Sequence, residues 1–217
     1  MARTASGFIT FEGVEGSGKT TQVRLLSEYL TKKGVQHVVT REPGGTILGE
    51  KIRALLLDPQ SRNMVPISEL LLYGAARSQH IEEVIEPALA EGKVVLCDRF
   101  TDATVAYQGR GRELPMNVIR VVNSLASADI KPDLTILLDL DPEKALARAR
   151  ARNATEGATS TTRFDDEELD FHRRVREGYL EIARDDSARI RVVSAEPPAE
   201  KVAKQIITHV NRRLGLT

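Results

Sequence analysis

The residues with the clearest chemical potential form a glycine-rich segment near the start of the chain. Residues 13–20 read Gly-Val-Glu-Gly-Ser-Gly-Lys-Thr, which is the spacing of a phosphate-binding P-loop. Glycines let successive backbone N–H groups turn inward around a polyphosphate, because no side chain blocks its approach. Lys19 can follow the phosphates as a mobile cation, and the Thr20 hydroxyl can ligate Mg²⁺. This segment predicts that the chain binds a triphosphate.

The flanking residues supply the setting that the motif requires. Residues 8–11 are apolar or β-branched and predict a buried strand, while residues 21–33 carry apolar residues at helical spacing. The helix would begin near Gly18 and direct the positive end of its dipole at the phosphates. The alternative, a glycine-rich turn with a stray lysine, accounts for neither flanking element.

A second polar pair follows the apolar run at residues 93–97, which is typical of a central parallel strand. Asp98 and Arg99 come directly after this run. In a P-loop protein an acid at this place orients Mg²⁺ or its waters. The arginine can bind a second phosphate through two parallel hydrogen bonds. A buried Asp–Arg ion pair without a ligand is the alternative.

Two other segments carry candidate ligand contacts. Arg41 opens the segment 41–46, Arg-Glu-Pro-Gly-Gly-Thr, which follows a predicted strand at 36–40, where open α/β sheets bind ligands. An ordinary turn with a surface ion pair is the alternative there. Tyr73 and Arg77 are four residues apart, so they share one helical face and could hold a planar base. A core tyrosine beside a surface arginine is the commoner arrangement.

Arginines also gather in the second half of the chain. A helix predicted at 142–152 carries Arg148, Arg150 and Arg152, and Arg163 follows the small, polar segment 153–162. A mobile segment flanked by arginines in a phosphate-binding protein predicts a lid, here spanning about residues 148–165. A solvated charged helix followed by a flexible loop would give the same pattern.

The elements that must position these residues alternate along the chain. Strands are predicted at 8–11, 36–40, 93–97, 134–139 and 190–193, and helices at 21–33, 47–57, 67–90, 115–128, 142–152, 166–184 and 198–214. The helix 67–90 is expected to bend or break near Pro87, and 60–66 and 101–114 are predicted as loops. Strands joined by helical crossovers predict an α/β fold, a three-layer sandwich of the P-loop NTPase type in which helices cover both faces of a five-stranded parallel sheet.

Composition limits the classes of protein that fit. The chain has 217 residues, 41% of them hydrophobic, which suffices for one domain over residues 1–217. Lys plus Arg and Asp plus Glu both number 31, and a net charge of zero argues against a dedicated nucleic-acid binder. No apolar run approaches membrane-spanning length, and the first residues lack a signal peptide. The single cysteine, Cys97, excludes an intrachain disulfide, and a cytoplasmic location is expected.

Six segments, taken in order, resemble the thymidylate kinase family from residue 8 to about residue 210. They are residues 11–21, 40–46, 73–77, 98–100, 106–109 and 163–164. The P-loop interior holds no arginine and the lid is arginine-rich, so the chain resembles the bacterial-type variant with its catalytic arginine in the lid. The resemblance implies ATP-dependent phosphorylation of dTMP to dTDP, with Mg²⁺, in a homodimer.

The resemblance also implies roles for individual residues. The ATP phosphates would be held by Gly13, Val14, Glu15, Gly16, Ser17, Gly18, Lys19, Thr20 and Thr21, with Arg148 and residues 195–197 beside the adenosine. The dTMP phosphate would face Arg41 and Arg99, its sugar Glu15 and Tyr107, and its base Tyr73, Arg77, Thr104 and Gln108. Catalysis would depend on Lys19, Arg99, Arg163 and, as the second choice in the lid, Arg150, with Thr20 and Asp98 at the metal.

Two other functions stay open on the sequence. A different nucleotide or nucleoside kinase would share the fold and use another acceptor. A regulatory P-loop switch would bind a nucleotide and recruit a partner, although separate basic clusters suit a second phosphorylated ligand that a switch does not need.

Overall fold

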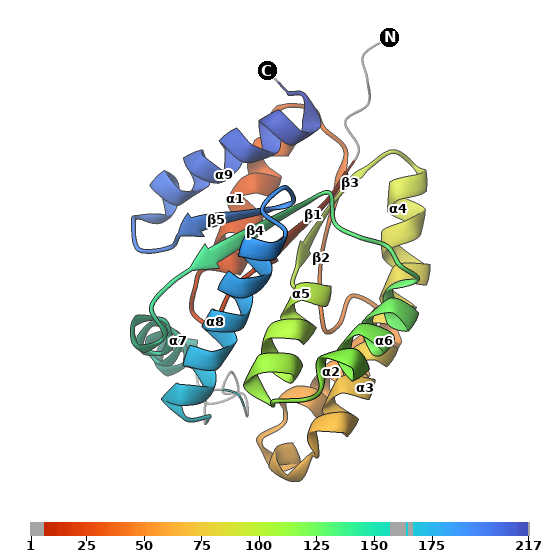
Figure 1. Ribbon diagram of the computed structural model, residues 1–217. Coiled ribbons are helices and arrows are strands. Elements are labelled where there is room, and N and C mark those ends of the chain that lie inside the picture. The colour runs from red at the N-terminus through yellow and green to blue at the C-terminus, as the bar shows by residue number, and fades with distance from the viewer. Residues whose placement is uncertain (1–6, 157–163, 165–166, 217) are drawn as a thin grey trace.

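The computed structural model describes residues 7–156, 164 and 167–216, and a five-stranded parallel sheet forms its centre (Figure 1). The strands are β1 (Gly7–Glu12), β2 (His37–Arg41), β3 (Val94–Asp98), β4 (Leu134–Asp139) and β5 (Ile190–Ser194), in the order β2-β3-β1-β4-β5. Each agrees with its predicted range to within one residue at either end. The central strand β1 lies between β3 and β4, and its register places Phe11 beside both Asp98 and Ile136.

Helices cover both faces of this sheet, which confirms the three-layer prediction. On one face α1 (Lys19–Lys32) packs against α9 (Ala199–Leu214); on the other lie α4 (Glu86–Ala90), α5 (Thr101–Thr104) and α8 (Leu169–Asp185) (Figure 1). The helix α3 (Pro66–His80) packs against both α2 (Ile47–Leu57) and α6 (Met116–Ser127). The helix α7 (Pro142–Glu156) lies against α8.

Both faces of β1 are buried, which explains its nearly continuous apolar sequence. Ile9 and Phe11 belong to the larger apolar core, whereas Phe8 packs edge-on against Phe100, with ring centroids 4.9 Å apart. Because side chains alternate between faces, Glu12 at the end of the strand points to the same face as Phe8. Glu12 is completely buried there.

Residues 101–114, which the sequence predicted as a loop, are mostly helical. The short α5 continues into a π-helical segment, Val105–Gly111. Gly109 and Gly111 suggested a loop, but the structure uses them for close packing. A Cβ on Gly111 would lie 2.7 Å from the Phe171 ring of α8, and one on Gly109 would lie 2.9 Å from the Met116 sulfur. Glycine therefore permits two helices to approach here, and it does not mark a turn.

The predicted helix 67–90 comprises α3, a π-helical turn at Ile81–Ile85 and α4. The irregularity lies just before Pro87, as predicted, because the proline ring and its missing N–H disfavour a regular α-turn. Two other segments depart from the prediction. Part of the predicted polar loop forms a 3-10 helix, Pro59–Asn63. The helix α7 extends to Glu156, so residues 153–156 are helical. The remainder of the predicted lid, residues 157–163 and 165, lies outside the described residues.

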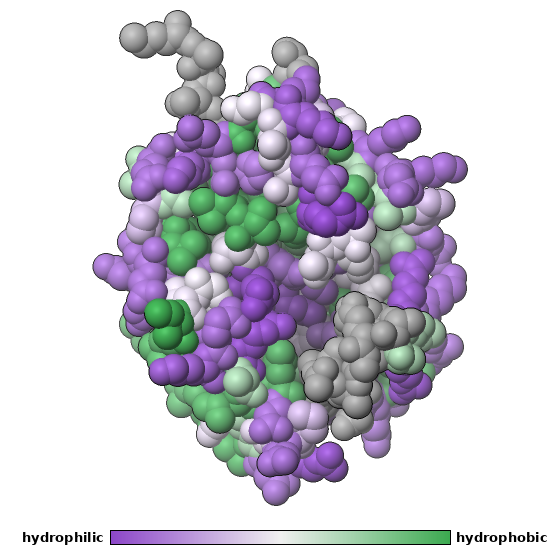
Figure 2. Space-filling model, turned by 180° about the vertical axis from the view of Figure 1, so that it is seen from behind, coloured by the Kyte–Doolittle hydropathy of each residue, from purple (hydrophilic) through white to green (hydrophobic). Residues whose placement is uncertain are grey.

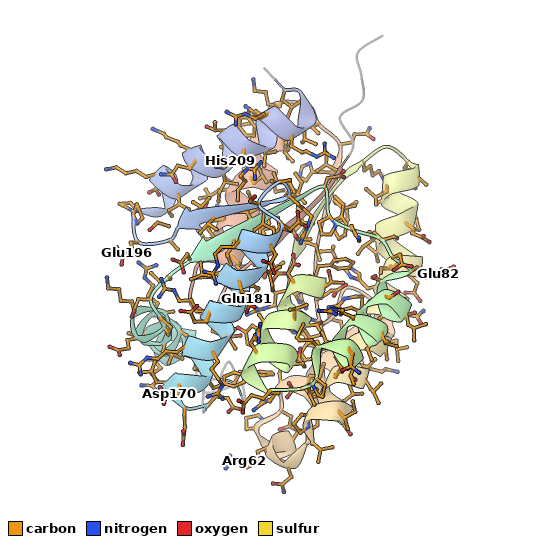
Figure 3. The ribbon with its side chains drawn as sticks, viewed as in Figure 1. Arg62, Glu82, Asp170, Glu181, Glu196 and His209 are labelled. Atoms are coloured by element: carbon orange, nitrogen blue, oxygen red, sulfur yellow. The ribbon has the colours of Figure 1, made fainter. Side chains whose placement is uncertain are left out.

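Among the described residues, no helix has the length and apolar character needed to cross a bilayer. Exposed charged side chains are distributed around the molecule: Arg62, Glu82, Asp170 and Glu196 come from different parts of the chain and point outward (Figure 3). Charged groups that face a common cavity lie instead at the carboxyl ends of the strands.

Candidate active site

A cavity of about 540 Å³ opens at the carboxyl ends of β1, β2 and β3. Its walls come from the P-loop, the segments after β2 and β3, the helices α2 and α3, and the helical segment 101–111. Figure 2 shows hydrophilic residues around a hollow near the middle of one face of the molecule. The volume suits a small-molecule site, and ligands of open α/β sheets bind at this edge.

The P-loop adopts a conformation that only glycine permits at its key positions. Gly13 has φ +136°, and a Cβ there would lie 2.5 Å from the Leu138 carbonyl oxygen. Gly18 has φ 90° and precedes α1 without any side-chain cap, so the first N–H groups of this helix remain available to an anion. The Lys19 ammonium donates to the carbonyl oxygens of Gly13 and Val14, each at 2.9 Å.

Thr20, the last residue of the P-loop, lies beside Asp98 at the end of β3. The Thr20 hydroxyl donates to Asp98 Oδ2 at 3.0 Å, and both residues line the cavity. Mg²⁺ prefers oxygen ligands and is commonly held by one or two carboxylates together with substrate phosphates. This hydroxyl–carboxylate pair therefore fits Mg²⁺.

Arg99, which lines the cavity, is held by oxygen atoms from three segments. Its Nη2 donates to Glu15 Oε1 at 2.8 Å and to the Tyr107 hydroxyl at 3.0 Å, and its Nη1 donates to the Tyr179 hydroxyl at 3.0 Å. Burial alone would lower the pKa of Arg99, but Tyr107, Tyr179 and Glu15 outweigh it and hold that pKa well above its usual value. The ion-pair partner is Glu15, not Asp98, so the interpretation of an Asp98–Arg99 pair is wrong.

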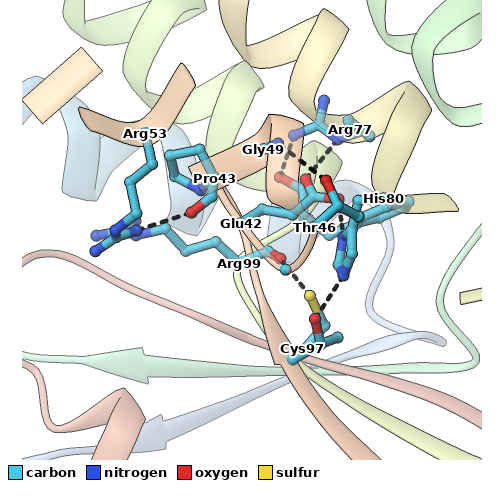
Figure 4. Close-up of polar contacts among 12 residues, drawn as sticks. Glu42, Pro43, Thr46, Gly49, Arg53, Arg77, His80, Cys97 and Arg99 are labelled. Atoms are coloured by element: carbon cyan, nitrogen blue, oxygen red, sulfur yellow. Dashed lines mark hydrogen bonds and ion pairs between the residues drawn. The ribbon is translucent and has the colours of Figure 1, made fainter. Parts of the chain in front are cut away.

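Arg77 is a buried wall of the same cavity, in contrast to the surface arginine of the alternative interpretation. Its side chain is 2% exposed and Nε lies 2.7 Å from Glu42 Oε2 (Figure 4). Further hydrogen bonds run to the Phe100 carbonyl oxygen, the Thr104 hydroxyl and Asn123 Oδ1. A guanidinium has five N–H donors, so these four bonds leave at most one N–H for a ligand.

Two more arginines border the cavity near the segment after β2. Arg41 Nη2 lies 2.9 Å from both carboxylate oxygens of Glu50, so it forms the surface ion pair of the alternative interpretation and also lines the cavity. Arg53 of α2 was missed by the sequence analysis, because no motif marks its helix. Burial and the nearby charge of Arg41 lower the pKa of Arg53. A bound anion would relieve this repulsion.

Comparison with known proteins agrees with this geometry. A family model described as thymidylate kinase matches residues 11–206. The chain is 51% identical over 210 residues to the thymidylate kinase of Desulforapulum autotrophicum, covering 96% of this chain and 92% of that one. It is 52% identical over 206 residues to the thymidylate kinase of Desulfosudis oleivorans, covering 94% and 96%. The chain belongs to the thymidylate kinase family. A crystal structure of thymidylate kinase from Ehrlichia chaffeensis matches it with a TM-score of 0.78 and 36% identity, over 95% of this chain and 99% of that one.

Membership of the thymidylate kinase family confirms the resemblance, the P-loop kinase fold and the assignment to phosphotransferases. The structure brings most of the predicted site residues to one cavity: Glu15, Gly16, Gly18, Lys19, Thr20, Thr21, Arg41, Tyr73, Arg77, Asp98, Arg99, Thr104, Tyr107 and Gln108 line it. Gly13, Val14 and Ser17 are buried parts of the P-loop itself. Arg148 and Arg150 are exposed on α7, where Arg148 Nη1 donates to the Ala195 carbonyl oxygen at 2.9 Å.

Arg163, the first choice for the lid arginine, lies outside the described residues. Besides Arg53, the sequence analysis missed Phe164, a buried residue of the cavity wall. It also missed Tyr179, whose hydroxyl accepts a hydrogen bond from Arg99, and Glu12, which accepts one from that hydroxyl. The sequence signal for Glu12 was its position, since an acidic residue at the end of a buried strand directly before a P-loop is unusual. The sequence analysis did not consider it.

We expect nucleotide affinity to depend on pH through Lys19, which lines the cavity. Burial, with the charge of Arg99 as a smaller contribution, lowers the pKa of Lys19 to about 8. Bound phosphates favour the ammonium form, so binding between pH 8 and 9 should take up a proton. We expect the affinity for ATP to fall by up to about tenfold per pH unit above this pKa. Calorimetric titration in buffers with different ionisation enthalpies measures the uptake.

The matched control for this prediction is Lys19→Arg, which keeps the positive charge and removes the titration, because arginine stays protonated at these pH values. Equal proton uptake by Lys19→Arg and the unmodified protein would assign the pH dependence to another group.

Proposed function

We propose that this chain catalyses the transfer of a phosphoryl group from ATP to dTMP, giving dTDP. The observation that supports this most directly is the two-part cavity, in which the P-loop faces a second set of basic and aromatic groups. A protein that only binds and hydrolyses one nucleotide would need the first part alone. In this proposal residues 13–21 hold the ATP phosphates, and dTMP occupies the other half.

The second half of the cavity suits a nucleoside monophosphate. Arg99, Arg41 and Arg53 provide positive charge for its phosphate, and the Tyr73 ring would stack on the base. Tyr107 and Glu15 would meet the sugar, since the Tyr107 hydroxyl donates to Glu15 Oε2 at 2.5 Å and holds both groups in place. Thr104 and Gln108 are buried residues of the cavity wall. The one N–H group of Arg77 that makes no hydrogen bond described above would reach a thymine carbonyl.

The mechanism that we propose relies on placement and charge, as phosphoryl transfer generally does. Lys19 neutralises charge on the transferring group, and Arg99 holds the acceptor phosphate in line with it. The acceptor oxygen is already ionised, so no general base is required. Thr20 and Asp98 would hold Mg²⁺, which would supply further charge neutralisation for the phosphates.

We propose that the lid, residues 148–165, supplies the remaining catalytic cation. Between Gly13 and Gly18 the polar side chains are those of Glu15 and Ser17, which carry no positive charge. Arg163 is the first candidate, because it matches the lid motif of the family, and Arg150 is the second. Arg148, beside residues 195–197, would contact the adenosine.

The test is a coupled assay with ATP and a panel of nucleoside monophosphates. We expect dTMP to give the highest kcat/KM. Preference for another acceptor would indicate a kinase of different specificity. Tight nucleotide binding without acceptor-dependent turnover would indicate a switch, and either result would reject the proposal.

We also propose that two copies of the chain associate through an apolar face on α3 and α6. Leu71, Val121 and Leu125 are 55%, 59% and 78% exposed on these two packed helices. Large apolar side chains exposed on two packed helices are typical of an interface. We expect Leu125→Glu to convert a dimer into a monomer in sedimentation equilibrium. Val192→Glu, at an exposed apolar residue of β5, is the control and should leave the dimer intact.

We place the reaction in the cytoplasm. The single cysteine, Cys97, is a buried free thiol, which is typical of proteins from reducing compartments. The balanced charge of the chain supports small-molecule substrates over nucleic acid as its partners.

A further inference from the structure

Arg99 has a backbone conformation that non-glycine residues seldom adopt. Its φ is 74°, in the left-handed region. Two consecutive residues of β1 hold this turn: the Arg99 N–H donates to the Phe11 carbonyl oxygen at 2.9 Å, and the Phe100 N–H donates to Glu12 Oε1 at 2.7 Å. One oxygen of the Glu12 carboxyl group therefore fixes the backbone that carries Arg99.

The other oxygen of Glu12 reaches the side chain of Arg99. The Tyr179 hydroxyl donates to Glu12 Oε2 at 2.7 Å and accepts from Arg99 Nη1 at 3.0 Å. Nη2 is held separately by Glu15 and Tyr107. The guanidinium is thus fixed at both of its terminal nitrogens, and Tyr179 determines the orientation of one of them.

A carboxyl group at this place is costly for the fold. Glu12 is completely buried, and burial, with Asp102 as a smaller contribution, raises the pKa of Glu12 to about 8. Transfer of a carboxylate out of water is unfavourable unless hydrogen bonds compensate it. Both hydrogen bonds of Glu12 described above lead to Arg99, directly along the chain or through Tyr179.

We propose that Glu12 and Tyr179 are a positioning pair for Arg99. Glu12 fixes the turn at Arg99 and, through the Tyr179 hydroxyl, the direction in which the guanidinium faces the acceptor phosphate. Neither residue lines the cavity, so both act through Arg99. This inference rests on the proposed function, in which Arg99 holds the acceptor.

The first test is Tyr179→Phe, which removes only the hydroxyl. Loss of a hydrogen bond to a charged group should lower kcat/KM for dTMP by about tenfold to a hundredfold, and the KM for ATP should stay unchanged. Glu12→Gln keeps an acceptor for the Phe100 N–H and replaces the oxygen that faces Tyr179, so a similar loss is expected. Tyr29→Phe is the control, because its hydroxyl bonds with Asn211 outside the cavity.

A double-mutant cycle separates positioning from a general structural role. In an Arg99→Ala background, Tyr179→Phe should change kcat/KM by less than about twofold, because residues that act through one another are not additive. The same loss in both backgrounds, or no loss in the unmodified background, would overturn the proposal. If the unmodified protein shows no activity on dTMP, the proposed function itself is wrong.

A measurement independent of turnover keeps the two hypotheses distinct. With ¹⁵N-labelled arginine, we expect a separate side-chain NMR signal from Arg99 in the unmodified protein and in Tyr29→Phe. That signal should shift and average in Tyr179→Phe. An unchanged signal would overturn the positioning pair whatever the substrate of the enzyme is.

Discussion

Replacing Lys19 with methionine is expected to lower the turnover of ATP and dTMP by about 10³-fold, the upper effect of removing one preorganised charge-stabilising donor. Methionine keeps the length of the apolar part of the side chain, with sulfur in place of one methylene group, and removes the ammonium group. The Lys19 ammonium donates to the P-loop carbonyl oxygens of Gly13 and Val14 and lines the cavity, where we propose that it meets the phosphates. Steady-state kinetics at saturating substrates measures the effect.

The fold of the Lys19→Met protein should survive, because burial and the charge of Arg99 already disfavour the ammonium form of Lys19 and lower its pKa. Thermal unfolding is the necessary companion measurement. Lys19→Arg is the matched variant, and it separates loss of charge from loss of fit. A folded Lys19→Met protein with near-normal turnover would contradict the assignment of the P-loop as the phosphoryl-donor site.

Replacing Arg77 with alanine is expected to lower the free energy of unfolding by about 3–5 kcal/mol, because it leaves a buried charge without its partner. That charge is Glu42, whose side chain is 4% exposed and otherwise contacts His80. Urea denaturation with linear extrapolation measures the loss. Binding of dTMP should weaken more than binding of ATP, since Arg77 lines the cavity and we propose that it contacts the thymine base.

Glu42→Gln is the variant that tests the cause of this loss. In the Arg77→Ala background it removes the unpaired carboxylate, so part of the lost free energy should return. Arg77→Ala with the stability of the unmodified protein would show that Glu42 is satisfied in another way. Equal weakening of dTMP and ATP binding would show that Arg77 is not specific to the base.

The fold and the P-loop could be predicted from the sequence because their signals are local. The P-loop is one continuous segment whose glycines, lysine and threonine work through their own backbone, so spacing alone specifies it. The strands could be located for a related reason: burial on both faces leaves apolar runs with sharp polar ends. Residues 101–114 show the limit of this approach, because Gly109 and Gly111 are required by contacts with Met116 and Phe171 and not by a turn.

The second half of the site was decided by tertiary structure, because its members come together only after the strands and helices pack. The partner of Arg99 is Glu15, 84 positions away, and not the adjacent Asp98. Tyr179 lies 167 positions from Glu12, yet its hydroxyl connects that carboxyl group to Arg99. Whether a charged side chain is exposed, paired or buried depends on such distant neighbours, since a charge is stable in the interior only where the fold supplies its partner.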